Sequence, residues 1–169
     1  DNYILFIFMC IMLIILPGPD TAIVTKNTLT ISKQAGLKTM VGTLCALMIH
    51  TSAAVFGLSA VIVKSALLFT IIKYIGAVYL VYLGVKTLIA LTRRKAPIVD
   101  AIPDEKTSSS FMQGFFTNLL NPKVAVFFLT FLPQFVQTTK SPLIPFFILG
   151  VSYTVLTLIW FVFYILLLN

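Results

Sequence analysis

Two stretches of sequence decide how this chain folds, because each interrupts a long apolar run: LPGPDTA at residues 16–22 and LLNPKVA at residues 119–125. Proline lacks a backbone N–H, and its ring clashes with the preceding turn of a helix. Gly18, between Pro17 and Pro19, can adopt backbone conformations that other residues avoid. Asn121 is a good N-cap, and Pro122 suits the first position of a helix. We therefore expect one helix to break at Pro17–Pro19 and another to restart at Pro122.

The rest of the chain is apolar enough to place both breaks inside a membrane. Of its 169 residues, 59% are hydrophobic and only 10% are charged, whereas a soluble domain carries about 25% charged residues. Five apolar runs reach the length of about 20 residues that a membrane-spanning helix needs: residues 3–25, 39–63, 66–92, 111–136 and 142–168. In lipid, a span outside a closed barrel is helical. The sequence therefore predicts an all-α integral membrane protein with five transmembrane helices.

The two breaks also indicate an internal repeat. When Pro19 is placed over Pro122, the two quoted stretches align, and spans one and four become equivalent. An odd number of spans in each repeat makes the repeats inverted, and paired interruptions at matching positions point to the central site of a transporter. We expect a single membrane domain, 1–169, with a first three-helix repeat over 1–92 and a second repeat over 111–169. We expect a 3+3 arrangement whose sixth helix is missing from the present chain.

The basic residues give an expected orientation. Net charge is +7, from 12 Lys and Arg against 5 Asp and Glu, and cytoplasmic loops of membrane proteins carry an excess of Lys and Arg. Most of the basic residues fall in the loop after span one and in the polar segment 93–110: Lys26, Lys33, Lys38, Arg93, Arg94, Lys95 and Lys106. We therefore expect both loops in the cytoplasm and the N-terminus outside. We expect no nucleic-acid partner, because the chain has no soluble domain or basic tract to bind one.

Opposite charges follow the two breaks, Asp20 after the first and Lys123 after the second. An ionisable group inside a span is a functional candidate by default. In one interpretation, the two side chains pair, or each reaches toward its nearer interface. In the other, they face a shared cavity and bind a zwitterion, with Asp20 on the ammonium and with Lys123 and helix N–H groups on the carboxylate. Asp20, Lys123 and Asn121 are thus the candidate substrate-binding residues, and Asp20 is also a candidate for proton coupling.

His50 is the only histidine in the chain and the only ionisable group of the second apolar run. Gly42, Ala46, His50, Ala53 and Gly57 follow each other at spacings of four, four, three and four, so we expect them to share one face of a helix. Small residues on one face let helices approach closely, which turns His50 toward the bundle interior. It is there either a hydrogen-bonded packing residue or a proton carrier.

The sequence offers little for metal or cofactor chemistry. Its two cysteines, Cys10 and Cys45, lie inside apolar runs, no CxxC motif is present, and one histidine cannot complete a zinc site with them. We therefore expect no metal, no organic cofactor, no catalytic residues and no enzymatic activity.

Four segments carry a resemblance to a known family: PGPD at 17–20; AG at 35–36 through Gly42 to His50; GAVYLVYLG at 76–84; and QGFFTNLLNPK at 113–123, continuing to FLPQF at 131–135. With these segments the sequence resembles the LysE/RhtB family of bacterial amino-acid exporters over nearly its whole length. The resemblance implies a multi-pass transporter of the bacterial cytoplasmic membrane that exports amino acids or close analogues by proton antiport. Members usually end in a sixth span, which fits the expected loss of the last helix. Whether the protein forms a homo-oligomer stays open.

One position departs from the family pattern. Many members have an acidic residue three positions before the histidine of span two, and this chain has Leu47 there. The missing carboxylate argues against cationic substrates such as lysine or arginine. It favours a neutral zwitterion such as threonine, homoserine or leucine.

Two other classes of function stay open. One is a membrane-embedded thiol oxidoreductase that uses Cys10 and Cys45, which requires their Cα atoms to lie within about 7 Å of each other. The other is a membrane subunit that transports nothing itself.

Overall fold

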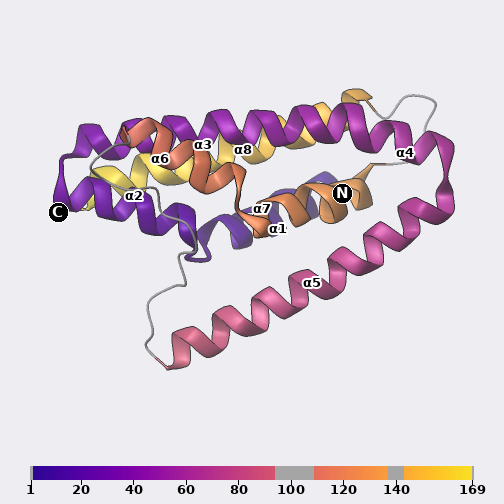
Figure 1. The fold of residues 1–169 in the computed structure, drawn as a ribbon, viewed down its shortest axis with the longest axis horizontal. Helices are drawn as coiled ribbons and strands as arrows, with labels where there is room; N and C mark the ends of the chain where they lie inside the picture. The colour runs from indigo at the N-terminus through magenta and orange to yellow at the C-terminus, as the bar shows by residue number, and fades with distance from the viewer. Residues whose placement is uncertain (1, 94–108, 137–142, 169) are drawn as a thin grey trace.

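A computed structural model describes residues 2–93, 109–136 and 143–168, and every regular element within these ranges is helical (Figure 1). In chain order, the elements are α1 (Asn2–Ile15), α2 (Pro19–Thr30), α3 (Lys33–Ala53), the π-helical turn η1 (Ala54–Leu58), α4 (Ser59–Lys64), α5 (Ala66–Thr92), α6 (Ser110–Leu119), α7 (Pro122–Val126), the π-helical turn η2 (Phe127–Phe131), the 3-10 turn η3 (Leu132–Phe135) and α8 (Leu143–Leu167). The prediction of an all-α chain is confirmed over the described residues.

Three helical stretches are each long and apolar enough to cross a membrane: Lys33–Val61, Ala66–Lys86 and Leu143–Leu167. Two more spans are counted if each bent pair crosses as one. These pairs are α1 with α2, bent by 53°, and α6 with Pro122–Phe135, bent by 48°. The described part of the chain therefore has three candidate spans, or up to five, where the sequence predicted five. Both predicted breaks are confirmed, one before Pro19 and one before Pro122.

The bundle is organised around α3, which packs against α2, α6 and α8. Two glycines let α3 and α6 approach until their backbones nearly touch. A Cβ added at Gly42 would clash with the carbonyl oxygen of Phe111, and one added at Gly114 would clash with the carbonyl oxygen of Thr39. The close approach fixes how α6, and therefore the second break, sits against the rest of the bundle.

The predicted small-residue face of α3 is right at its start and wrong at its end. Gly42 and Ala46 are buried and His50 is half-buried, but Ala53 and Gly57 are exposed. An added Cβ at Gly57 would meet no atom within 4 Å. Past His50 the buried residues instead include Thr51, Ala54, Val55 and Leu58, and α3 is followed at Ala54 by the π-helical turn η1. Ala53 and Gly57 therefore lie outside the buried face of this segment.

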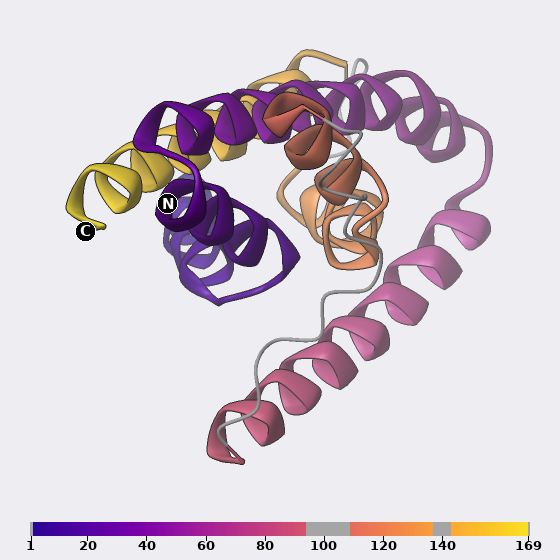
Figure 2. The same cartoon turned by 60° about the vertical axis from the view of Figure 1, so that its left-hand side comes forward.

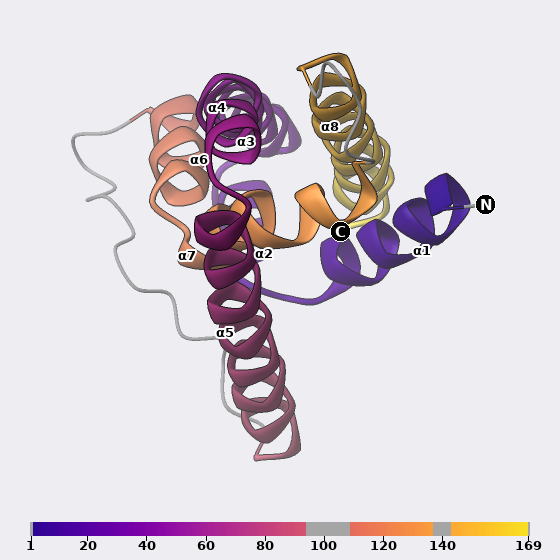
Figure 3. The ribbon, with the colours of Figure 1, turned by 90° about the vertical axis from the view of Figure 1, so that its right-hand side faces the viewer.

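The helix α5 leans away from the other helices, as the views in Figures 1, 2 and 3 agree. Its contacts are with α4, α7 and η2. Gly76 packs directly on the side chain of Thr130, which leaves no room for a Cβ at that position. Most of the apolar side chains that the structure places on α5 are exposed, as lipid-facing residues of a spanning helix would be.

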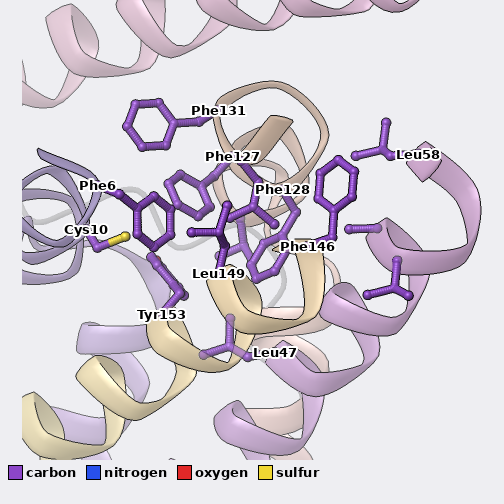
Figure 4. Close-up of a cluster of buried hydrophobic side chains, with 14 of the residues drawn as sticks. Phe6, Cys10, Leu47, Leu58, Phe127, Phe128, Phe131, Phe146, Leu149 and Tyr153 are labelled. Atoms are coloured by element: carbon purple, nitrogen blue, oxygen red, sulfur yellow. The ribbon is translucent and has the colours of Figure 1, made fainter. Parts of the chain in front are cut away.

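A cluster of aromatic and aliphatic side chains forms the main core (Figure 4). The rings of Phe127 and Phe131 lie 5.0 Å apart, and that of Phe127 lies 4.6 Å from Tyr153. The cluster also includes Phe6 and Cys10 of α1. Through it, α1 packs against η2 and α8. This core supports the region in which the two broken helices meet.

The predicted polar segment 93–110 lies outside the described residues except at its ends, Arg93, Ser109 and Ser110.

Candidate functional site

The break in the first helix leaves a carbonyl oxygen that a side chain of the second broken helix takes up. In an α-helix, the carbonyl of Leu13 accepts from the N–H of the residue four positions on, and that residue is Pro17, which has no N–H. The side-chain ammonium of Lys123 donates to this oxygen instead, at 3.3 Å. Lys123 also lies beside Gly18, since a Cβ added there would stand 3.6 Å from its Nζ. The two breaks therefore meet in space.

The second break repeats this arrangement with a histidine. The carbonyl of Asn118 lacks its usual donor, because the residue four positions on is Pro122. It accepts from the backbone N–H of Asn121 at 3.0 Å, and Nε2 of His50 lies 3.3 Å away. The imidazole stacks on Phe128 with ring centroids 5.6 Å apart. His50 therefore faces the second break, as the sequence predicted for a bundle-facing residue.

Both helices restart as their sequences predict. Pro19 is the first residue of α2, after Gly18 in extended conformation, and Asp20 lies in its first turn. The first N–H groups of an α-helix have no intrahelical acceptor, and the N-cap residue of α2, Gly18, has no side chain to supply one. In α7, Asn121 is the N-cap, and its Oδ1 accepts from the backbone N–H of Lys123 at 3.0 Å. The side-chain oxygen of Asn121 is thus engaged in capping α7.

The carboxylate of Asp20 is held from one side only. Its Oδ2 accepts from the side-chain amide of Asn118 at 2.8 Å. Its Oδ1 is buried with no hydrogen-bond partner among the described residues. Within those residues, no Asp20 oxygen lies within 4.0 Å of the Lys123 ammonium, although the two charges act on each other. The two side chains are neighbours that do not form a direct ion pair.

Both charged side chains open onto one pocket between the broken helices, α3 and α8. Its space is about 350 Å³, including the part that is open to the outside. The lining combines one carboxylate, one ammonium, several polar groups and an apolar wall: Leu13, Ile14, Leu16, Gly18, Asp20, Thr21, Leu47, Asn118, Asn121, Lys123, Tyr153, Thr157 and Phe161. Asp20, Lys123 and Asn121, which the sequence proposed, all line it. His50 does not line it, but it is linked to it through Asn118, whose backbone carbonyl it contacts and whose side chain bonds to Asp20.

Asn118 is the residue of this site that the sequence analysis missed. It is 1% exposed, and it contacts Asp20 through its side chain and His50 through its backbone. A signal for it was present, because an amide inside an apolar run is costly to bury unless it is hydrogen-bonded.

A second buried polar group was also missed. The amide of Asn27 in α2 donates to Thr39 of α3 at 2.8 Å and to Gln113 of α6 at 3.1 Å. All three side chains are at most 2% exposed. These bonds connect α2 to α3 and α6 next to the Gly114 contact.

The described residues contain neither a disulfide nor a cluster of side chains that could bind a metal ion. Cys10 is buried in the core and Cys45 is exposed, and both are free. Within the ranges that the structure describes, no group of three or more His, Cys, Asp or Glu side chains is placed to hold a metal ion.

Comparisons with known proteins agree on the family. The sequence pattern of the LysE type translocator matches residues 11–169. The membrane protein YrhP of Bacillus subtilis, described as uncharacterized, is 39% identical over 165 residues, which cover 94% of this chain and 79% of that protein. A leucine efflux protein of Klebsiella pneumoniae is 29% identical over 166 residues, covering 98% of this chain and 78% of that protein. No solved structure matches the chain. Because the family pattern covers nearly its whole length, the chain belongs to the LysE type translocator family.

Proposed function

We propose that this protein exports neutral amino acids and that the pocket between the two broken helices binds them. The observation that carries the proposal is the placement of Asp20 and Lys123, which line one pocket without pairing directly. Membership of a translocator family and the similarity to leucine efflux proteins support it.

A zwitterion fits this arrangement of charges. Asp20 accepts the ammonium of the substrate, and Lys123 donates to the carboxylate with the N–H groups that its bond to Leu13 leaves free. The uncapped N-terminus of α2 supplies further backbone donors toward the same carboxylate. Asn121 lines the pocket beside Lys123 and holds it in position through its capping bond.

The apolar lining of the pocket determines which class of substrate side chain it accepts. Leu47 is 1% exposed and lines the pocket with Leu13, Ile14 and Phe161. Since Leu47 stands where many family members carry a carboxylate, a second cation would have no partner there. We propose that the transported side chain is neutral and apolar, with leucine as the first candidate.

The transport cycle that we propose is alternating access coupled to protons, in the bacterial cytoplasmic membrane. The two matching breaks, bent by 53° and 48°, support an inverted repeat in which each broken helix belongs to one half. Asp20 is the proposed proton carrier, and His50, linked to it through Asn118, is the second candidate for this role.

Efflux from intact cells tests the proposal. Cells that make the protein are loaded with dipeptides, each of which releases one amino acid inside, and export is measured with and without a proton uncoupler. We expect uncoupler-sensitive export of leucine that Asp20→Asn or Lys123→Gln abolishes while each variant still inserts in the membrane. Lys64→Gln, at the exposed end of α4, is the matched control and should export normally.

Two results would contradict the proposal. Normal efflux from both site variants would remove the assigned pocket. If the wild-type protein exports no amino acid while both variants change its assembly with other membrane proteins, the non-transporting subunit becomes the better interpretation.

A further inference from the structure

The side chain of Asn118 lies at the pocket, almost fully buried, between Asp20 and the break in the second helix. We propose that Asn118 and Asp20 together form the subsite for the primary ammonium group of the substrate, so that Asn118 is a specificity-determining residue. This inference rests on the proposed function and names a residue and a chemical requirement within it.

The orientation of the Asn118 amide follows from its partner. Its Nδ2 donates to Asp20 Oδ2 at 2.8 Å, and an ionised carboxylate has only acceptors, so the nitrogen end must face it. The Oδ1 end is thereby fixed as an acceptor. It is buried, and no donor reaches it from the described residues.

Two buried acceptors on these hydrogen-bonded side chains, Asp20 Oδ1 and Asn118 Oδ1, thus have no hydrogen-bond partner among the described residues. Buried polar atoms in native proteins nearly always have partners, and an exception calls for a missing ligand, ion or water. A primary ammonium offers three N–H donors and a positive charge, whereas a hydroxyl offers one donor and a carboxylate none. Of these groups, the ammonium matches both the number of acceptors and the charge of Asp20.

The backbone holds Asn118 in place. Its carbonyl accepts from the N–H of Asn121 and faces His50, because Pro122 cannot supply the ordinary helical donor. These contacts fix the residue before a ligand arrives, which lowers the entropy that binding must overcome.

The first arm of the test uses the wild-type protein in proteoliposomes and measures leucine counterflow. Unlabelled leucine competes against its analogue 2-hydroxy-4-methylpentanoate, in which a hydroxyl replaces the ammonium. We expect the hydroxy acid to inhibit at least about tenfold more weakly than leucine, the loss expected for charge-assisted hydrogen bonds. Equal inhibition by the two compounds would overturn the subsite and leave amino-acid export standing.

The second arm compares two neighbouring variants. Asn118→Leu is expected to weaken inhibition by leucine by about 10- to 100-fold while changing that by the hydroxy acid less than about threefold. Thr117→Val is the matched control, because Thr117 Oγ1 is also buried with no partner in the described part of the chain, but the residue does not line the pocket. This variant should leave both values unchanged. If Asn118 has a merely structural role, Asn118→Leu would weaken inhibition by both compounds equally. This result would contradict the proposal.

Two further results keep the test decisive. If Asn118→Leu elutes as an aggregate in gel filtration, Asn118→Ser replaces it, and it should lose part of the preference for leucine over the hydroxy acid. An unchanged preference would overturn the subsite. If the wild-type protein exports no amino acid from dipeptide-loaded cells, the proposed function and the subsite fail together.

Discussion

The side-chain ammonium of Lys123 donates a hydrogen bond to the main-chain carbonyl of Leu13 at 3.3 Å. The acceptor is available because Pro17 cannot donate to it, so the second broken helix holds the end of the first. A substrate carboxylate would compete with the Leu13 carbonyl for the same ammonium. Binding would then change how firmly the two halves are joined, which links the pocket to the conformation of the break.

Restoring the missing backbone donor should remove this link. Pro17→Ala supplies an N–H for the Leu13 carbonyl and favours a continuous helix through the break. We expect leucine export to fall at least about tenfold while thermal stability in detergent stays the same or rises by up to about 3 kcal/mol. Efflux assays and thermal unfolding of the purified protein measure the two effects.

Pro145→Ala is the control for this prediction. Pro145 lies in the first turn of α8, where an N–H has no intrahelical acceptor in any case. It should affect neither transport nor stability. Full export by Pro17→Ala would show that the break itself is not needed.

The contact between α3 and α6 should be the most sensitive packing site. In Gly114→Ala the new Cβ meets the backbone carbonyl of Thr39, which cannot move without shifting a helix. We expect a loss of about 1–3 kcal/mol, as for overpacked cores, seen as a lower unfolding temperature in detergent. Gly57→Ala, where an added Cβ meets no atom within 4 Å, should not lower it. Equal stability of the two variants would contradict the close approach.

The role of His50 can be separated into positioning and proton transfer. In His50→Gln, the amide can still donate to the Asn118 carbonyl, but it cannot titrate near neutral pH. If His50 carries protons, leucine–leucine exchange in proteoliposomes should stay within about threefold of wild type, whereas accumulation driven by a pH gradient should be lost. Retained gradient-driven accumulation would leave proton coupling to Asp20 and assign His50 to packing alone.

Replacing both cysteines tests the redox alternative. Cys10 is buried in the core and Cys45 is exposed, so the two thiols lie in different surroundings. The double variant Cys10→Ala/Cys45→Ser should export leucine at the wild-type rate, with at most a modest loss of stability from the smaller side chain at position 10. Abolished activity together with a folded protein would instead favour thiol chemistry.

Much of the local structure could be predicted because it depends on covalent features of single residues. The missing N–H groups of Pro17 and Pro122 place the breaks, the side chain of Asn121 starts α7, and the apolar composition identifies the spanning segments. The third apolar run, 66–92, coincides with α5 from its first residue to its last. These features need no knowledge of what lies beside them.

The contacts between helices could not be predicted in the same way. The small-residue face was extended through Ala53 and Gly57, but both are exposed, and other residues past His50, such as Ala54 and Leu58, face the core. Asn118 was one polar residue among several in its run, and only the approach of α2 gave it Asp20 as a partner.

By itself, the sequence determined that the chain is helical and apolar, that two of its helices break, and that a charge of opposite sign follows each break. The tertiary structure alone decided what those charges do with each other. Asp20 bonds to Asn118 and Lys123 to Leu13, so neither neutralises the other directly. The reason is geometric: backbone constraints are fixed within a few residues, but a hydrogen-bond partner is chosen among all groups that packing brings within about 3 Å.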